Sequence, residues 1–383
     1  MRRIEGAWLD RAATRSVCTA LENAGHQVFF VGGCVRNALL RTCVSDIDIA
    51  TDARPDRVTE IMKGEGFRVV PTGIDHGTVT VLVDAVAHEI TTFRKDVGTD
   101  GRRAVVRFTT DITADARRRD FTMNALYADM RGRVTDPVGG LADLTMRRLR
   151  FIGLPEERIR EDHLRILRFF RLHAWYGDPD RGLDEAALMA CKALQGSLDS
   201  LPKERIGAEM RKLLLAPDPG AAVAAMEWSG ILTRLLPGAA AGALPLMIRH
   251  EADLGLAVSF PRRLAVIGGR NAQTMLRLGK ADLRMLDRLR AGLESAEGAA
   301  VFAYRHGAGM ALDRGVVAAA LAGRSISKNL SEEATRGASQ IFPVGAADLM
   351  PRLRGAALGA KLKELETRWI ASDFEQTREQ LLT

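Results

Sequence analysis

Two short segments near the start of the chain hold residues whose types and spacing suit phosphate chemistry. The first, GGCVRN at 32–37, follows an apolar stretch and precedes a helix-like one. Gly32 and Gly33 let a phosphate approach the backbone closely, the N-terminus of the following helix offers unpaired N–H groups, and Arg36 can donate to phosphate oxygens. Taken alone, the segment is better explained as an ordinary strand-to-helix turn that carries a solvated arginine.

The second segment, DIDIA at 46–50, carries two carboxylates. Successive side chains of a strand alternate between its faces, so Asp46 and Asp48 share one face while Ile47 and Ile49 face the core. Two adjacent negative charges are costly unless a cation neutralises them, and oxygen ligands favour a hard ion such as Mg²⁺. The alternative is a surface strand with alternating acids.

Together the two segments place a triphosphate cradle and a metal site between residues 32 and 48. Nucleotidyl transfer by two metal ions requires both, because one ion activates the attacking hydroxyl and the other neutralises charge on the triphosphate and the leaving pyrophosphate. This order of motifs resembles the polymerase β-type nucleotidyltransferase superfamily. The resemblance implies that Asp46 and Asp48 are catalytic and bind Mg²⁺, with Glu89 in AHEITTF as a candidate third carboxylate.

Four later motifs narrow the resemblance to the class II tRNA nucleotidyltransferase and bacterial poly(A) polymerase family. They are ARRRDFTMNALYAD at 116–129, DPVGGLADL at 136–144, EDHLRILRFFR at 161–171 and KERIGAEMRKLL at 203–214. The resemblance implies that Arg118 and Arg119 bind nucleotide, with Arg119 on the triphosphate, and that Asp120 and Asn124 contact the sugar or the head domain. Without it, the spacing of these residues indicates a capped helix with Asp120 in an early turn.

The segment at 161–171 predicts one helix with an apolar side and a polar side. Asp162 lies on the polar side with three arginines, and Leu164 is the exception to the pattern; the arginines are Arg165, Arg168 and Arg171. A carboxylate acceptor beside guanidinium donors matches the base edge that cytosine and adenine share and clashes with that of uracil and guanine. The family resemblance implies such a protein template here, and the alternative is a solvated, arginine-rich helix face.

Other positions in these motifs are predicted to have structural roles. Asp136 and Gly139–Gly140 are expected to shape a turn between head and neck, and Glu209 to pair with an arginine. His76 is interpreted as a turn residue, since the seven histidines show no metal-ligand spacing. Asn37 departs from the family pattern, which usually has aspartate there, so its role is open.

The elements that must position these residues change character along the chain. Strands are predicted at 27–31, 46–50, 77–84 and 87–93, and helices at 8–24, 34–41, 55–65 and 114–128. Residues 94–113 indicate a mobile loop or an irregular hairpin, and the pattern is helical from about residue 155 onward. The sequence thus predicts an α+β fold with a head at 1–145, a helical neck at 146–215, and an all-α body and tail at 216–383. The family resemblance implies that the head is the nucleotidyltransferase domain and that the body and tail bind tRNA.

Composition limits the classes of function. The 383 residues carry a formal net charge of +7, and no apolar run approaches the roughly 20 residues of a membrane span. The N-terminus has no apolar export segment, so we expect a cytoplasmic protein. None of the four cysteines lies in a CxxC pair, which argues against a disulfide framework or a zinc knuckle. The basic charge favours an anionic partner.

The resemblance therefore predicts a template-independent CCA-adding enzyme, which transfers CMP, CMP and AMP from CTP and ATP to the 3′ end of tRNA. The implied partners are the tRNA acceptor arm and the two nucleotides, with no membrane and no stable protein partner. An enzyme that adds only A stays open as an alternative. A poly(A) polymerase is disfavoured because no basic-aromatic stretch follows the first motif. A catalytically inactive RNA-binding protein is disfavoured because the acidic and EDxxR residues are all present.

Overall fold

The computed structural model of the chain describes residues 2–74, 77–100, 103–350 and 352–383. His76, predicted to be a turn residue, lies outside them. The chain divides into two compact units, Met1–Ala239 with Gly269–Arg277, and Ala240–Gly268 with Leu278–Thr383. Both predicted boundaries, at 145 and 215, fall inside the first unit, so the three-part division stays a prediction.

The first unit begins with a mixed sheet of seven strands in the order β3-β4-β5-β2-β1-β8-β9. Strands β2 and β5 run parallel, and the other neighbouring strands pair antiparallel. The strands are β1 (Val28–Val31), β2 (Ile47–Thr51), β3 (Arg68–Gly73), β4 (Thr78–Val83), β5 (Val86–Thr92), β8 (Tyr127–Ala128) and β9 (Val134–Thr135). The four predicted strands are confirmed as β1, β2, β4 and β5, and with them the α+β class.

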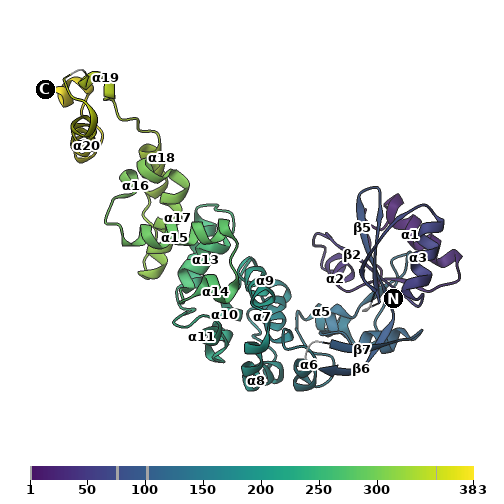
Figure 1. Ribbon diagram of the computed structural model, residues 1–383. Coiled ribbons are helices and arrows are strands. Elements are labelled where there is room, and N and C mark those ends of the chain that lie inside the picture. Colours follow the sequence, from purple (N-terminus) through teal and green to yellow (C-terminus); the bar gives the residue numbers. More distant parts are fainter. Residues whose placement is uncertain (1, 75–76, 101–102, 351) are drawn as a thin grey trace. The chain divides into compact units, whose positions relative to one another are not determined.

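Helices cover both faces of this sheet (Figure 1). Helices α1 (Ala12–Asn23) and α3 (Pro55–Gly64) pack on one face, and α2 (Gly33–Leu39) packs on β1 and β2 from the other. Pro55 occupies the first turn of α3, where its missing N–H costs nothing. The three predicted helices are confirmed, and α2 alone lies on the face that also carries Asp48.

The predicted helix at 114–128 is wrong over most of its length. Helix α4 (Ile112–Arg117) ends early, a 3₁₀ turn η2 (Thr122–Asn124) follows, and Tyr127 then enters strand β8. The backbone N–H of Thr122 donates to the carbonyl of Arg150, and Phe121 forms a β-bridge with Phe151. These contacts with a segment nearly thirty residues away replace the helical hydrogen bonds that the local sequence favours.

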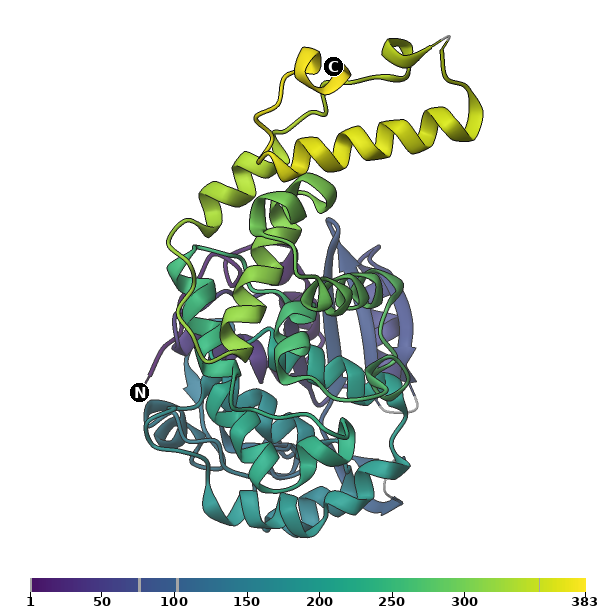
Figure 2. The same cartoon turned by 90° about the vertical axis from the view of Figure 1, so that its left-hand side faces the viewer.

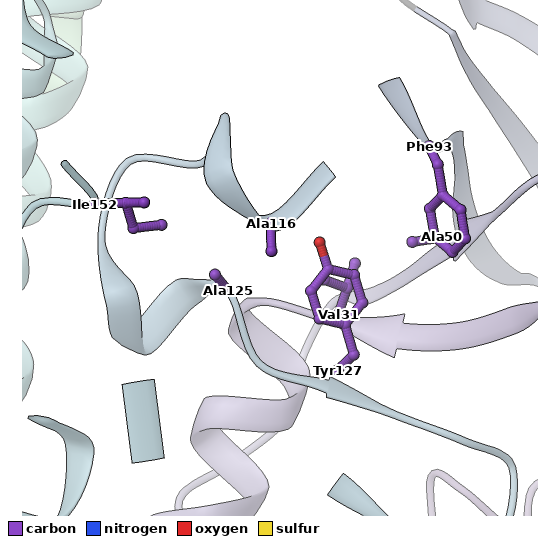
Figure 3. Packing of buried hydrophobic residues seen from close by; sticks show 7 residues of the cluster. All are labelled: Val31, Ala50, Phe93, Ala116, Ala125, Tyr127 and Ile152. Atoms are coloured by element: carbon purple, nitrogen blue, oxygen red, sulfur yellow. The ribbon is translucent and has the colours of Figure 1, made fainter. Parts of the chain in front are cut away.

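Residues 94–113 contain a β-hairpin, as one of the two interpretations predicted. Strands β6 (Arg94–Asp100) and β7 (Arg103–Phe108) form a separate two-stranded sheet whose register shifts between Asp96 and Gly98. A buried apolar cluster links β1, β2, α4 and β8 (Figure 3). Its members are Val31, Ala50, Phe93, Ala116, Ala125, Tyr127 and Ile152.

The rest of the chain is helical, as predicted from about residue 155. In the first unit these helices are α5 (Gly140–Thr145), α6 (Pro155–Glu161), α7 (Arg165–Tyr176), α8 (Glu185–Ala193), the 3₁₀ helix η3 (Gln195–Ser200), α9 (Lys203–Leu214), α10 (Gly220–Trp228), α11 (Ile231–Leu235) and α14 (Ala272–Leu276). Helix α7 buries Ile166, Leu167, Phe169 and Phe170 and packs on α9.

The second unit is a helical array that ends in a small apolar cluster around Trp369. Its helices are α12 (Leu244–Asp253), α13 (Phe260–Ile267), α15 (Lys280–Glu294), α16 (Ala299–His306), α17 (Ala308–Leu321), α18 (Leu330–Ala338), α19 (Ala346–Leu349), α20 (Gly355–Ala371, the long yellow helix in Figure 2) and α21 (Arg378–Leu382). No helix among the described residues is both long and apolar enough to cross a membrane.

Candidate functional site

The predicted site residues line a single polar cavity of about 690 Å³ in the first unit. They come from α2 and the turn before it, from β2 and the residue that precedes it, from β5, from the segment between α4 and β8, and from α7 and the turn that leads into it. They are Gly32, Gly33, Arg36, Asp46, Asp48, Glu89, Arg118, Arg119, Asp120, Asn124, Asp162, Arg165, Arg168 and Arg171. We call this space the nucleotide cavity.

Three carboxylates occupy one edge of the nucleotide cavity. Asp46 directly precedes β2, Asp48 lies within it, and Glu89 is the register partner of Asp48 on the parallel strand β5. Burial, together with the charges of Glu89 and Asp46, raises the pKa of Asp48 to about 6. Among the described residues, no group of three Asp, Glu, His or Cys side chains is arranged to hold a metal ion alone. The raised pKa of Asp48 shows that burial and the neighbouring carboxylates both disfavour its negative charge and that the protein does not neutralise this charge fully.

Gly32 allows the cavity wall to come close to the backbone. Its φ of 74° and ψ of −120° lie in a region that favours glycine, and it forms the N-cap of α2. A Cβ atom at this position would lie 3.5 Å from the carbonyl oxygen of Asn124 and 3.7 Å from Nη1 of Arg119. The turn at Gly32 therefore lies next to Arg119, the arginine that the family resemblance places on the triphosphate.

Arg36 is buried in the cavity wall rather than extended into solvent. Its side chain donates to Oδ1 of Asn124 at 2.5 Å and to Oδ1 of Asn37 at 2.9 Å, and its guanidinium lies 3.7 Å from the centre of the Tyr176 ring. Burial lowers the pKa of Arg36. The Nδ2 atom of Asn37 donates to the Cys43 carbonyl at 2.9 Å. An amide serves both contacts, because it offers an acceptor and a donor, whereas the aspartate usual in the family has no donor.

Asp115 anchors the two arginines and was missed by the sequence analysis. It accepts from Nε of Arg118 at 2.8 Å, from Nη2 of Arg119 at 3.0 Å and from the Tyr127 hydroxyl at 2.7 Å. Burial would raise the pKa of Asp115, but the guanidinium groups of Arg119 and Arg118 hold it at about 2. The signal was its position three and four residues before the arginines, the spacing of ion pairs on a helix.

Asp120 and Asn124 connect the head to α7. Both are buried; Asn124 donates to Oδ1 of Asp120 at 3.2 Å, and Arg168 donates to Oδ2 of Asp120 at 2.7 Å through Nε. Arg168 holds the pKa of Asp120 far below its usual value, against the opposing effect of burial. This arrangement makes Asp120 a structural bridge in the wall of the cavity.

The expected single helix over 161–171 is wrong, because α6 ends at Glu161 and α7 begins at Arg165. Asp162 has an extended backbone, and its Oδ1 accepts from the Leu164 N–H at 3.1 Å, a local bond that competes with helix formation. Asp162 also pairs with Arg205 of α9 at 3.2 Å, and Arg165 pairs with Glu161 at 2.5 Å. Both predicted base-reading side chains still line the nucleotide cavity.

Two further sequence predictions are confirmed. Glu209 of α9 accepts from Nε of Arg171 at 2.5 Å and so holds α7 and α9 together. Asp136 accepts from the backbone N–H groups of Gly140 at 2.8 Å and Leu141 at 2.9 Å, which closes the turn before α5.

Two cavity-lining cations on α9, Arg205 and Lys212, were also missed. They lie seven residues apart, which places them on one face of a helix, and that spacing was the available signal. Lys212 also lines an adjoining cavity of about 280 Å³, beside Trp175 and Tyr176 of α7. The sequence analysis assigned no role to either aromatic residue.

The comparisons with known proteins agree with this geometry. Residues 28–150 match the family described as the Poly A polymerase head domain, and residues 182–242 match a probable RNA and SrmB-binding site of polymerase A. A CCA-adding enzyme of Streptococcus pyogenes serotype M5 is 42% identical over 240 residues, which cover 62% of this chain and 56% of that protein. Over these regions the chain is similar to the class II tRNA nucleotidyltransferase and bacterial poly(A) polymerase family.

Solved structures of family members share the fold over nearly the whole chain. The Bacillus stearothermophilus CCA-adding enzyme in complex with CTP superposes with a TM-score of 0.73 at 24% identity, covering 97% of this chain and 95% of that one. The Thermotoga maritima CCA-adding enzyme complexed with tRNA gives 0.70 at 18% identity, with coverages of 100% and 98%. The matched region spans little more than half the length of the curated streptococcal relative.

Proposed function

We propose that the protein is a CCA-adding tRNA nucleotidyltransferase, which adds CMP, CMP and AMP from CTP and ATP to the 3′ end of tRNA. One observation carries this proposal: the carboxylates of β2 and the base-selecting candidates Asp162 and Arg165 line the same cavity. The relatives named CCA-adding enzymes, among them one solved with CTP and one with tRNA, support the same activity. A tRNA substrate would place the protein in the cytoplasm.

Asp46 and Asp48, with Glu89 beside them, suit a hard divalent cation such as Mg²⁺. The donors are carboxylate oxygens, and burial together with the charges of Glu89 and Asp46 raises the pKa of Asp48, so a bound cation would favour its ionised form. Mg²⁺ in such enzymes is commonly held by one or two carboxylates together with substrate phosphates and water, which is consistent with the lack of a complete protein ligand set among the described residues. Two bound ions would activate the attacking hydroxyl and stabilise the leaving pyrophosphate.

The reaction is a transfer of one nucleotidyl group. The 3′-oxygen of the RNA forms a bond to the α-phosphorus, the bond from that phosphorus to the pyrophosphate oxygen breaks, and the hydroxyl proton passes to solvent. Arg119, held by Asp115 and Tyr127, would bind the triphosphate beside Gly32.

Base selection would fall to Asp162 and Arg165. Asp162 keeps acceptor capacity beyond its bonds to Leu164 and Arg205, and the guanidinium of Arg165 has more N–H groups than its contacts with Glu161 and the carbonyls of Arg158 and Arg118 use. An acceptor beside a donor complements the edge that cytosine and adenine share. Arg205 and Glu161 act as supports that fix the two side chains in position.

The decisive experiment incubates the purified protein with tRNA transcripts that end before CCA, after C and after CC, each with a single nucleotide. A CCA-adding enzyme extends the first two with CTP and the third with ATP, and then stops. Extension of the CC transcript alone would indicate an enzyme that adds only A, and long adenosine tails would indicate a poly(A) polymerase. Asp46→Ala and Asp48→Ala should abolish every extension while tRNA binding persists, and turnover by both variants would remove the metal assignment.

A further inference from the structure

The adjoining cavity of about 280 Å³ shares a wall with the nucleotide cavity. Both are lined by Asp46, Asp48, Arg171 and Lys212, whereas Trp175 and Tyr176 line only the smaller one. The base-selecting candidates Asp162 and Arg165 line only the larger one. The carboxylates therefore stand between two spaces of different chemical character.

In-line displacement requires that the attacking group and the leaving group reach the same phosphorus atom from opposite sides. The attacking oxygen and the leaving oxygen lie on opposite sides of the phosphorus, so an enzyme that binds the triphosphate on one side of its carboxylates must admit the acceptor from another. We propose that the smaller cavity, which we call the acceptor cavity, receives the 3′-terminal nucleotide of the RNA, with Trp175 as its stacking surface and Lys212 as its phosphate contact. This inference rests on the proposed function.

Trp175 is built as a stacking platform. Its side chain is 41% exposed, although it is a large apolar residue, and its Nε1 donates to the Lys212 carbonyl at 2.8 Å. That bond ties the indole to α9 and leaves a ring face accessible. Tyr176 follows it, with the ring centres 6.4 Å apart, and is itself held by the buried guanidinium of Arg36. A fixed aromatic surface binds the base of a single-stranded end with little dependence on its identity.

Lys212 supplies the cation for the phosphate backbone. Its side chain is exposed, and its ammonium has no acidic partner within the part of the chain that the structure describes. Arg171, which lines the same wall, is paired with Glu209, and Arg36 already donates to Asn37 and Asn124. Lys212 is thus the lining cation best able to meet an incoming phosphate.

The test measures the Michaelis constants for RNA and for nucleotide separately, using tRNA transcripts that end in C or CC. Trp175→Ala should raise the KM for RNA roughly tenfold to a hundredfold, the usual effect of losing one base stack. The KM for CTP and the kcat at saturating RNA should stay near wild type. Trp175→Phe, which keeps an aromatic face but loses the bond to Lys212, should raise the KM for RNA only about threefold.

Lys212→Met should also raise the KM for RNA, and it should reduce the salt dependence of RNA binding. Lys63→Met is the matched control, because Lys63 is an exposed residue of α3 on the opposite face of the sheet. As a binding readout without turnover, 2-aminopurine at the RNA 3′ end should be quenched by the wild-type protein and less so by Trp175→Ala. A thermal unfolding transition close to that of the wild type shows that each variant is folded.

The outcomes separate the two proposals. If the wild-type protein extends no RNA, the proposed function fails. If it extends RNA but Trp175→Ala and Lys212→Met leave the KM for RNA unchanged, the acceptor cavity is wrong. A rise in the KM for CTP instead would assign this cavity to the nucleotide and would also overturn the inference.

Discussion

At the scale of single residues, Asp115 controls the arginines that face the nucleotide cavity. It is almost fully buried and accepts from Arg118, Arg119 and Tyr127. We predict that Asp115→Asn destabilises the first unit, because two guanidinium groups lose their counter-ion while remaining partly buried. Thermal unfolding at pH 7 should show a lower Tm, and the KM for CTP should rise because Arg119 is no longer held beside Gly32.

The same residue gives a pH signature. The pKa of Asp115 is about 2 in the folded protein against 3.8 for a free carboxyl, so its ionised form stabilises the fold by about 2 kcal/mol above roughly pH 4. This contribution disappears as the pH falls from about 4 towards 2. The difference in Tm between wild type and Asp115→Asn should therefore shrink over that range. A difference that stays constant with pH would contradict the assignment.

Asp162 offers a test of selectivity at the same scale. Asp162→Ala removes the proposed acceptor from the base-reading pair, and one lost buried hydrogen bond weakens discrimination by roughly tenfold to a hundredfold. The variant should incorporate UTP or GTP at rates approaching those of CTP and ATP, as measured in single-nucleotide extension assays. Arg205→Met is the companion variant, since it removes the ion pair to Asp162 but keeps the proposed acceptor, and it should relax selectivity less. A slower enzyme with unchanged preference would return Asp162 to a purely structural role.

At the scale of elements, the position of α9 depends on one glycine. A Cβ atom at Gly207 would lie 1.8 Å from the carbonyl oxygen of Leu276 in α14, so no larger residue fits without moving a helix. Helix α9 carries Arg205 and Lys212 into the cavity wall, and its Glu209 holds Arg171. We predict that Gly207→Ala destabilises the first unit by about 1–3 kcal/mol and raises the KM values for RNA and nucleotide together.

Gly359 provides the matched control for that variant. It lies inside α20, and beyond its chain neighbours and the backbone of its own helix no atom lies within 4 Å of the position of an added Cβ. Gly359→Ala should be neutral or stabilise its helix by up to about 1 kcal/mol, since alanine favours helix over glycine. Urea unfolding of the two variants compares the same chemical change with and without a steric clash. Equal changes in the free energy of unfolding for the two variants would show that α9 and α14 are not in tight contact at Gly207.

At the scale of the whole molecule, net charge should govern the affinity for RNA. The chain carries a formal charge of +7, and an RNA bound through its phosphates releases counter-ions. The Kd for tRNA should therefore rise steeply between low and moderate salt and depend little on the sequence of the tRNA body. Binding of CTP at a fixed divalent ion concentration should have a smaller salt slope and serves as the control. A flat response would argue for a different partner.

Local patterns in the sequence determined much of this protein. Strand and helix periodicity depend on backbone geometry alone. They account for the alternating acids at β2 and the arginine spacing of α7, and the paired glycines mark the turn before α2. The sequence therefore indicated the α+β class and the residues of one polar cavity before any tertiary contact was known. The motifs that resemble the nucleotidyltransferase family supplied their order and their implied chemistry.

The tertiary structure decided how those residues meet. The parallel register of β2 and β5 places Glu89 opposite Asp48. The β-bridge between Phe121 and Phe151 interrupts the helix expected at 114–128, and the chain enters strand β8 instead. The helix break at Asp162 depends on the neighbouring Leu164 N–H and on Arg205, which lies 43 residues further along the chain. Except for the bond between Leu164 and Asp162, these contacts have no local signature, because packing between distant segments selects among conformations that the local sequence allows almost equally.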